Sequence, residues 1–320
     1  MLEGRPLIMN LIASRITTHP LLPRLPEIGR VFQRDELTPE ALADIAPHVD
    51  VLVGASNLKV PKAELDLYPN LRIVADFGVG YDGFDVEEIA RRNLLCAHTP
   101  DVLSEDVADL AVGLMLSITR RLPQADAFVR AGRWPKENFP LGRRIARRRI
   151  GVAGLGRIGR VVAQRAEAFR MEVGYTSQHP KDVPWRRFED VKSLAAWADV
   201  LVVVIPATPE THHLINAEVL DALGPEGYLV NIARGALVDT AALIRALEEK
   251  RIAGAALDVF EHEPEVEAEF RKLENVVLAP HIGSATVETR CAMADLVCEN
   301  IRLGLAGKPL LTPVPGTRRA

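Results

Sequence analysis

Short apolar runs alternate with helix-like stretches along most of the chain. Residues 38–46 and 85–92 show apolar positions at helical spacing, and each stretch begins at a good capping residue, Thr38 or Asp85. Strands that alternate with helices predict a parallel, doubly wound sheet. In this part of the chain, the runs typical of buried strands are residues 7–12, 49–54, 71–77 and 94–98.

The same alternation continues in the second half and predicts a second parallel sheet. Between the strands, helical patterns occupy residues 160–170, 217–223 and 240–250. The predicted strands are residues 150–153, 171–176, 200–205, 228–233, 252–259 and 276–279.

Two longer helical patterns indicate how the chain is divided. A chain of 320 residues exceeds what one core usually carries, so two domains are expected. Residues 104–117 are apolar on most faces and lack proline, as in a buried helix that leaves the first sheet. The last pattern, 286–305, is expected to pack back on the N-terminal domain. The predicted domains are therefore 1–100 with 285–320, and 101–284.

The composition indicates a globular protein without a bulk attraction for nucleic acid. The chain is 48% hydrophobic and 26% charged, with a net charge of -4 and a pI near 6.1. Five arginines from Arg143 to Arg149 are interpreted as a solvated or subunit-facing loop, in preference to a phosphate-tracking patch. Trp134 fits a subunit interface and the cover of a core equally well.

Cysteine use and the apolar segments favour a cytoplasmic protein. Cys96, Cys291 and Cys298 show neither metal-type spacing nor an even disulfide set, so no metal site is expected and reduced thiols fit best. The apolar start, 6–12, is too short for a signal peptide, and no run approaches the ~18 residues of a membrane helix. No membrane partner is expected.

Residues 150–159 read IGVAGLGRIG and place a GxGxxG motif between a strand and a helix. In that setting Gly154 allows a sharp turn, Gly156 lets the backbone approach a pyrophosphate, and Gly159 lets helix and strand pack closely. The helix start offers N–H groups to the phosphates. This context favours dinucleotide binding over a structural tight turn.

The residue that usually selects between NAD and NADP is not acidic in this chain. An NAD site places Asp or Glu about 20 residues beyond the glycines, and that position here is Ser177. Without a carboxylate, a 2′-phosphate is not repelled, so NADP is favoured and NAD is the alternative. The donors that could bind a 2′-phosphate are Arg157, Ser177, Gln178 and Lys181.

A second glycine-rich stretch, 78–83, follows the predicted strand 71–77. Ligands in doubly wound sheets lie beyond the carboxyl ends of strands. This loop is therefore a candidate for backbone N–H contacts to an anion, and a plain connector is the alternative interpretation.

Arg234, Glu263 and His281 also follow predicted strands. Hydride transfer from a nicotinamide to a ketone forms an alkoxide, which needs a proton. An imidazole, with an ordinary pKa of about 6.5, can supply that proton at neutral pH, and a nearby carboxylate favours its protonated form. An arginine can bind a carboxylate beside the ketone and polarise the carbonyl. The three residues together predict reduction of a 2-oxo acid.

Six stretches match one family: residues 77–82 (FGVGYD), 154–159 (GLGRIG), 231–235 (NIARG), 256–261 (ALDVFE), 263–264 (EP) and 280–283 (PHIG). With these, the chain resembles the D-2-hydroxyacid dehydrogenase family over nearly its whole length. The resemblance implies an α/β protein with two doubly wound parallel-sheet domains, a flavodoxin-like substrate domain and a Rossmann nucleotide-binding domain.

The resemblance also implies roles for particular residues. Arg234 would bind the substrate carboxylate, Glu263 would pair with the histidine, and His281 would be the proton donor. Val79 and Gly80 would contact the substrate through their backbone.

Other residues would form the pocket wall and the cofactor site. Leu58 is a candidate for the wall of the substrate pocket. The expected cofactor-binding residues are Gly154, Leu155, Gly156, Arg157, Ile158, Ser177, Gln178, Ile205, Pro206, Ile232, Ala233, Arg234, Asp258, His281 and Gly283.

Within the family, residues 132–135 (GRWP) and 139–141 (FPL) are similar to NADPH-dependent glyoxylate/hydroxypyruvate and hydroxyphenylpyruvate reductases. These often carry Ser-Arg where this chain has Ser177 and Gln178, and a neutral amide attracts a phosphate less than a guanidinium does. The resemblance implies a homodimer formed through the nucleotide domains. NADPH-dependent reduction of glyoxylate or hydroxypyruvate is expected. The alternatives are a phosphoglycerate- or hydroxyphenylpyruvate-type dehydrogenase and a non-catalytic, nucleotide-sensing corepressor.

Overall fold

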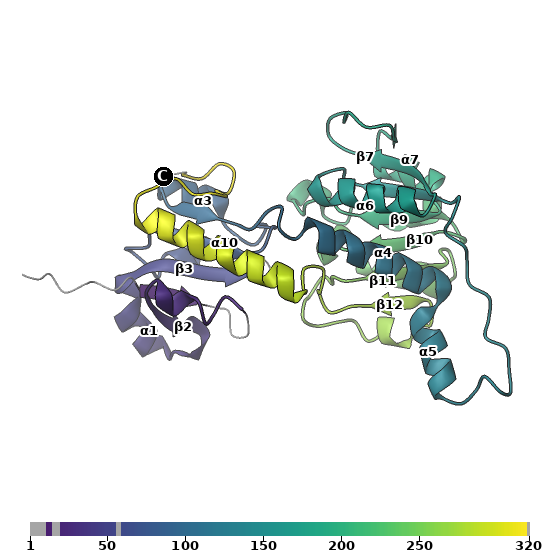
Figure 1. The fold of residues 1–320 in the computed structure, drawn as a ribbon, viewed down its shortest axis with the longest axis horizontal. Coiled ribbons are helices and arrows are strands. Elements are labelled where there is room, and N and C mark those ends of the chain that lie inside the picture. The colour runs from purple at the N-terminus through teal and green to yellow at the C-terminus, as the bar shows by residue number, and fades with distance from the viewer. Residues whose placement is uncertain (1–10, 15–19, 56–58, 319–320) are drawn as a thin grey trace, which may run out of the picture. The chain divides into compact units, whose positions relative to one another are not determined.

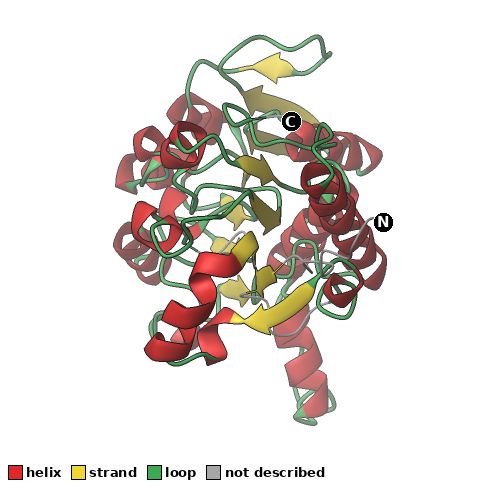
Figure 2. Cartoon of the chain, turned by 90° about the vertical axis from the view of Figure 1, so that its left-hand side faces the viewer, coloured by secondary structure: helices red, strands yellow, loops and turns green. Residues whose placement is uncertain are grey.

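The computed structural model describes residues 11–14, 20–55 and 59–318, and in it the chain forms two compact units (Figure 1). Unit 1 is Met1–Leu103 with Ala285–Ala320, and unit 2 is Ser104–Ser284. Each unit is built on one sheet whose described strand pairs are all parallel, with helices beside the strands (Figure 2). The predicted fold class, two doubly wound α/β sheets, is confirmed.

The sheet of unit 1 has the strand order β2-β1-β3-β4-β5. The last helix of the chain, α10, packs on β4. The strands are β1 (Leu11–Ser14), β2 (Arg30–Gln33), β3 (Val49–Ala55), β4 (Ile73–Phe77) and β5 (Leu95–Ala97). The helices are α1 (Pro39–Ile45), α2 (Lys62–Leu65), α3 (Val86–Arg91) and α10 (Val287–Leu305).

The sheet of unit 2 has the strand order β12-β11-β10-β9-β6-β7-β8. The chain adds β7 and β8 on one side of β6 and β9 to β12 on the other, so the order of strand addition reverses beside β6. Doubly wound sheets bind ligands at such a switch point. The strands are β6 (Arg149–Ala153), β7 (Glu172–Thr176), β8 (Arg186–Arg187), β9 (Val200–Val203), β10 (Tyr228–Asn231), β11 (Gly254–Leu257) and β12 (Val276–Leu278). The helices are α4 (Ser104–Arg120), α5 (Leu122–Arg130), α6 (Arg157–Ala168), α7 (Val191–Trp197), α8 (Ala217–Leu223) and α9 (Thr240–Glu248).

Helices of two groups cover this second sheet. α4 and α6 contact each other and the strands, whereas α7, α8 and α9 form a connected second group. Leu201 and Leu229 of the strands are fully buried against Leu220 of α8 and Leu243 of α9 in one hydrophobic cluster. Burial of these apolar side chains makes the sheet a rigid base for the loops at its edge.

The sequence pattern does not predict β2, β8, α2, α5 and α7. β2 and β8 have no buried side chain, so they lack the apolar run that identifies a strand. The helix predicted at 160–170 begins earlier, at Arg157, which places Gly159 in its first turn.

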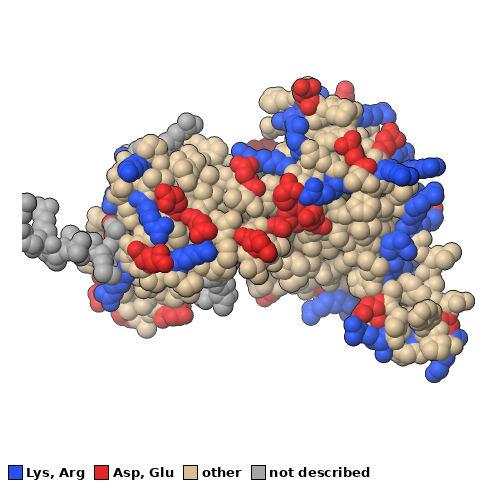
Figure 3. Space-filling view, in the orientation of Figure 1, with Lys and Arg blue, Asp and Glu red and all other residues tan. Residues whose placement is uncertain are grey.

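Charges of both signs are interspersed over the visible face of each unit (Figure 3). Three arginines of the 143–149 cluster pair with acidic side chains: Arg143 contacts Glu226 at 2.9 Å, and both Arg148 and Arg149 contact Asp199. None of the helices in the described part of the chain has the length and apolar character needed to cross a membrane.

Candidate active site

The glycine turn after β6 contains the close approaches that its motif predicts. Gly154 has a φ of +105°, and a Cβ there would lie 2.8 Å from the carbonyl oxygen of Val204. A Cβ on Gly159 would lie 2.0 Å from the carbonyl oxygen of Gly154, so both positions exclude larger residues. A Cβ on Gly156 would meet no atom of the described chain within 4 Å, which leaves this backbone open to a ligand.

α6 begins directly after this open turn, with Gly156 as its N-cap. The first-turn N–H groups and the positive end of the helix dipole favour an anion at that position. A turn that requires glycine, an open backbone and a helix start together fit the pyrophosphate of a dinucleotide.

The loop after β7 carries the residues predicted to select the cofactor. The hydroxyl of Ser177 donates a hydrogen bond to the carbonyl of His179 at 2.6 Å. Arg187 of β8, which sequence reasoning missed, donates from its guanidinium to the carbonyls of Ser177 (3.1 Å) and Gln178 (3.5 Å). The loop therefore joins a hydroxyl, an amide and a guanidinium, with no carboxylate at position 177.

Most of the other predicted residues follow strands at the same edge of the unit 2 sheet. β6, β9, β10, β11 and β12 are successive parallel neighbours, so their carboxyl ends lie along one edge with the glycine turn. The residues that follow them are Ile205 and Pro206 after β9, Arg234 after β10, Asp258 after β11 and His281 after β12.

The Arg234 turn is held by the buried side chain of Asn231. The amide nitrogen of Asn231 donates to the carbonyl of Arg234 at 2.8 Å, and its oxygen accepts from the N–H of Ala233 at 3.1 Å. Gly235 packs so closely on the next segment that a Cβ would lie 1.9 Å from the carbonyl carbon of Phe260. Arg234 lies close enough to Glu263 for its charge to lower the pKa of that carboxyl.

Glu263 connects the Arg234 side of the site to His281. Its Oε1 accepts from the N–H of Phe260 at 3.0 Å, and its Oε2 lies 2.7 Å from Nδ1 of His281. Burial raises the pKa of Glu263, but the hydrogen bond and charge of His281 outweigh this effect and hold the pKa below its ordinary value. Because an ionised carboxylate only accepts, Nδ1 donates to it, and Nε2 is left for proton transfer.

Asp258 fixes the turn that carries His281. Its carbonyl accepts from the N–H of His281 at 2.9 Å, and its carboxylate oxygens accept from the N–H groups of Ile282 and Gly283 at 2.8 Å each. His281 has a φ of +53°, a left-handed conformation that residues other than glycine rarely adopt. Burial raises the pKa of Asp258 despite these hydrogen bonds. In this structure its side chain positions His281, whereas its predicted nicotinamide contact stays a prediction.

The remaining predicted cofactor residues differ in exposure. Leu155, Ile232 and Gly283 are buried; Ile158, Ile205 and Ala233 are half-buried; Arg157, Gln178 and Pro206 are exposed.

In unit 1, the loop after β4 carries Val79 and Gly80. Nδ1 of His98 lies 3.0 Å from the carbonyl oxygen of Val79, and the ring of His98 meets that of Tyr81 edge-on at 5.4 Å. These contacts fix the backbone of the loop from the side of β5. Leu58, the other residue predicted to bind substrate, lies outside the described residues.

Comparisons with known proteins show the family. The family model for the NAD-binding domain of D-isomer-specific 2-hydroxyacid dehydrogenases matches residues 112–283. The chain is 45% identical over 302 residues to a 2-ketogluconate reductase of Gluconobacter oxydans (strain 621H), covering 93% of this chain and 97% of the relative. It is 50% identical over 267 residues to glyoxylate/hydroxypyruvate reductase A of Arabidopsis thaliana, covering 83% of this chain and 85% of the relative.

A solved structure is similar over nearly the whole chain. It is the crystal structure of the NADPH-dependent glyoxylate/hydroxypyruvate reductase of Sinorhizobium meliloti in complex with NADP and malonate. The TM-score is 0.91 and the sequence identity is 41%, and the match covers 97% of this chain and 98% of that one. The predicted family is therefore confirmed. The chain belongs to the D-isomer-specific 2-hydroxyacid dehydrogenase family of NAD(P)-dependent oxidoreductases.

Proposed function

We propose that the protein reduces a small 2-oxo acid, with glyoxylate or hydroxypyruvate as first candidates, to the D-2-hydroxy acid with NADPH. The observation that carries this proposal is the 2.7 Å contact between Glu263 and His281 in a site that also contains Arg234. A proton donor, a guanidinium and a dinucleotide turn along one sheet edge are what this reduction requires. The names of the A. thaliana and S. meliloti proteins support the choice of substrate.

In the proposed reaction, Arg234 binds the substrate carboxylate and His281 completes the alcohol. The guanidinium offers a planar pair of donors, and its charge polarises the adjacent carbonyl. A reduced nicotinamide, when bound, supplies hydride to the carbonyl carbon. Nε2 of His281 gives its proton to the carbonyl oxygen, and the ring regains a proton from solvent. Glu263 stabilises the protonated ring through Nδ1.

The loop after β7 supports NADPH as the cofactor, with NADH as the alternative. Position 177 carries a hydroxyl where a carboxylate would repel a 2′-phosphate. The guanidinium of Arg187, anchored on the Ser177 and Gln178 carbonyls, adds the positive charge that the Gln178 amide lacks. The S. meliloti protein is NADPH-dependent by name.

The same proposal assigns a role to each unit. Unit 2 is the proposed nucleotide domain, since the NAD-binding family model falls within it at residues 112–283. Unit 1 is the proposed substrate domain, with the backbone of Val79 and Gly80 as substrate contacts. The proposed domain limits are 1–100 with 285–320, and 101–284.

The proposed assembly is a homodimer formed through unit 2. Apolar side chains on α5 and the segment after it support this assembly, because a second copy would remove them from water. They are Leu122, Val129, Trp134 and Leu141, which are 50%, 54%, 68% and 97% exposed. The proposed location is the cytoplasm, and the three free cysteines support it. Light scattering on the purified protein tests the assembly.

Loss of reduced-nicotinamide absorbance tests the proposed function. NADPH and NADH should each be offered with glyoxylate, hydroxypyruvate, hydroxyphenylpyruvate and 2-ketogluconate. We expect the highest kcat/KM with NADPH and one of the first two acids. The G. oxydans relative favours 2-ketogluconate as the second candidate substrate. A preference for 2-ketogluconate would change the proposed substrate but not the proposed type of reaction. Absence of turnover with every 2-oxo acid would contradict the proposal and favour a non-catalytic role.

A further inference from the structure

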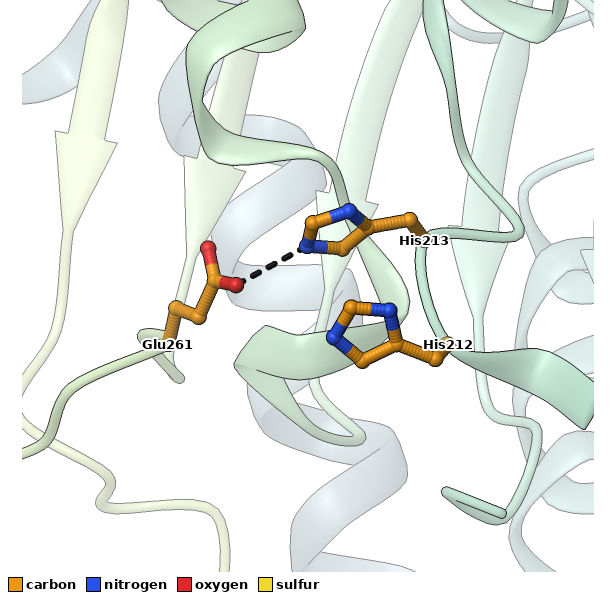
Figure 4. Close-up of side chains that lie close together, drawn as sticks. All are labelled: His212, His213 and Glu261. Atoms are coloured by element: carbon orange, nitrogen blue, oxygen red, sulfur yellow. Dashed lines mark hydrogen bonds and ion pairs between the residues drawn. The ribbon is translucent and has the colours of Figure 1, made fainter. Parts of the chain in front are cut away.

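Two histidines and one glutamate lie together in unit 2, outside the residues assigned to catalysis. His212 and His213 follow a short 3-10 helix (Pro209–Thr211) beyond β9, and Glu261 lies four residues past the end of β11. Figure 4 shows the two imidazole rings one above the other, with the Glu261 carboxylate facing them. One potential ligand atom from each side chain lies within 4.8 Å of the other two.

The backbone at His213 brings both rings to the same side of the chain. Neighbouring side chains of an extended segment point to opposite faces. Here His213 has a left-handed φ of +52°, and the two rings stack with centroids 3.9 Å apart and 27° between their planes. The N–H of His213 donates to the carbonyl of Ala236 at 2.9 Å and holds this conformation. An uncommon backbone conformation therefore aligns two imidazoles.

Glu261 is held in place facing these rings. Its Oε1 lies 2.8 Å from Nε2 of His213, and its Oε2 accepts from the hydroxyl of Thr240 at 2.8 Å. A hydrogen bond such as the one from Thr240 orients a carboxylate that binds a metal. Glu267 lines the same small cavity as Thr240 and Glu261, and its buried Oε2 has no hydrogen-bond partner within the described ranges.

We propose that His212, His213 and Glu261 bind a zinc ion. Two imidazole nitrogens and one carboxylate oxygen are a ligand set that Zn²⁺ accepts, with water in the fourth position. Bond lengths of about 2.1 Å set the ligand atoms of a tetrahedral site roughly 3.4 Å apart. His213 and Glu261 already lie within that spacing, and the exposed side chain of His212 can rotate to complete it. Zinc takes the place of the hydrogen between Nε2 of His213 and Glu261, and the neutral imidazole then carries its proton on Nδ1.

The ion has a structural role in this proposal. The N–H of Phe260, the residue before Glu261, donates to the carboxylate of Glu263. Zinc at Glu261 therefore braces the segment that positions Glu263, without touching the reacting carbonyl. Cysteine spacing predicts no metal site, but it cannot reveal two neighbouring histidines whose glutamate lies 48 residues beyond His213.

Calorimetric titration with ZnCl₂ tests the proposal on full-length protein that lacks a histidine tag and has been freed of metal. We expect one zinc ion per chain and an affinity that falls at least about tenfold in His213→Ala and in Glu261→Gln. His212→Ala gives the same loss and removes only an exposed ring, so its fold is the least affected. His48→Ala, which removes an exposed histidine of unit 1, is the matched control and should bind zinc as the wild type does.

Thermal unfolding supplies the second measurement. Zinc should raise the apparent Tm of the wild type and of His48→Ala but not that of the three cluster variants, while their metal-free Tm values report whether they fold. Equal zinc affinity in all these proteins would overturn the proposal, as would the absence of zinc binding by the wild type.

Discussion

Two carboxylates hold His281 in different ways. Asp258 binds the backbone of its turn through three hydrogen bonds, whereas Glu263 binds the ring at Nδ1. Because both partners are buried or half-buried, water competes weakly with these bonds. The imidazole is thereby oriented before substrate arrives, which is what proton transfer in a defined direction requires.

Glu263→Gln keeps the shape of the side chain and removes its charge. We expect kcat/KM for reduction to fall about 10- to 100-fold, as for loss of a charge-assisted hydrogen bond worth about 1.5–3 kcal/mol. The pKa of this carboxyl is lowered, so Glu263 is ionised at neutral pH and favours the protonated ring. Steady-state kinetics measure this loss. Glu265→Gln, at an exposed position of the same segment, is the control; wild-type kcat/KM in Glu263→Gln would contradict this role.

Ser177→Asp introduces the carboxylate that NAD sites carry at this position. It should repel a 2′-phosphate and lower the ratio of kcat/KM with NADPH to kcat/KM with NADH by about tenfold or more, equivalent to ~1.4 kcal/mol. Steady-state kinetics with each cofactor measure the ratio. An unchanged ratio would remove the reason for choosing NADPH.

Arg187→Ala tests the contribution of the guanidinium beside Ser177. In the proposed site its charge attracts the 2′-phosphate, so the KM for NADPH should rise about tenfold in the variant while that for NADH is unaffected. Arg186→Ala is the matched control, since Arg186 instead lies over the ring of Phe188 at 4.6 Å. Equal effects on both cofactors would exclude contact with the 2′-phosphate.

At the residue scale, the sequence identified side-chain types and, through the family resemblance, the pairing of Glu263 with His281, but not the contact of Arg187 with Ser177. Arg234, Glu263 and His281 were predicted because each follows a strand. The contact of Arg187 with Ser177 depends on the pairing of β8 with β7, which places Arg187 opposite Tyr175. A strand of two exposed arginines has no local pattern that could have predicted that pairing.

At the element scale, α3 is stabilised by charges around Glu88. Its carboxylate lies 2.6 Å from Arg91 and 2.8 Å from Arg92, and the N-cap Asp85 accepts the Glu88 N–H at 3.0 Å. The hydrogen bonds from Arg91 and Arg92 lower the pKa of Glu88 from 4.5 to about 2. A carboxyl whose pKa falls on folding stabilises the folded state above its unfolded pKa. This contribution is lost as the pH falls toward about 2.

Glu88→Gln should therefore lower the apparent Tm by a few degrees at neutral pH, because it removes these ion pairs. The difference from the wild type should shrink as the pH falls from 4.5 toward about 2, where the wild-type carboxyl takes up a proton. Unfolding curves across this pH range measure it, with Glu87→Gln on the exposed face of the same helix as control. A difference that is independent of pH would show that the ion pairs are not its cause.

Which elements the sequence could predict follows from their burial. β4 is buried along its whole length and α4 has a long apolar face, so both produce clear patterns. α7 is a helix of seven residues with only three buried side chains, so its sequence pattern does not predict a helix. Its N-terminus is nevertheless marked by Asp190, which accepts the N–H of Ser193 at 2.7 Å.

At the scale of the whole molecule, residues far apart in the chain meet because of strand order. α10 returns to unit 1 from the end of the chain, and a Cβ on its Gly304 would lie 2.8 Å from the Ile73 side chain. In unit 2, parallel strands joined by crossovers bring the glycine turn, Arg234 and His281 to one edge. Alternation of strands and helices predicted both sheets, but the order and register of strands depend on long-range packing that local patterns do not specify.

NADPH oxidation by the wild type and by His281→Ala, with glyoxylate and with hydroxypyruvate, tests whether His281 is the proton donor. Removal of the proton donor should reduce kcat at least about 100-fold. The variant should keep the rise in apparent Tm that NADPH gives the wild type, because the cofactor still binds the folded protein. Wild-type turnover by a folded His281→Ala that still binds NADPH would show that His281 is not the proton donor.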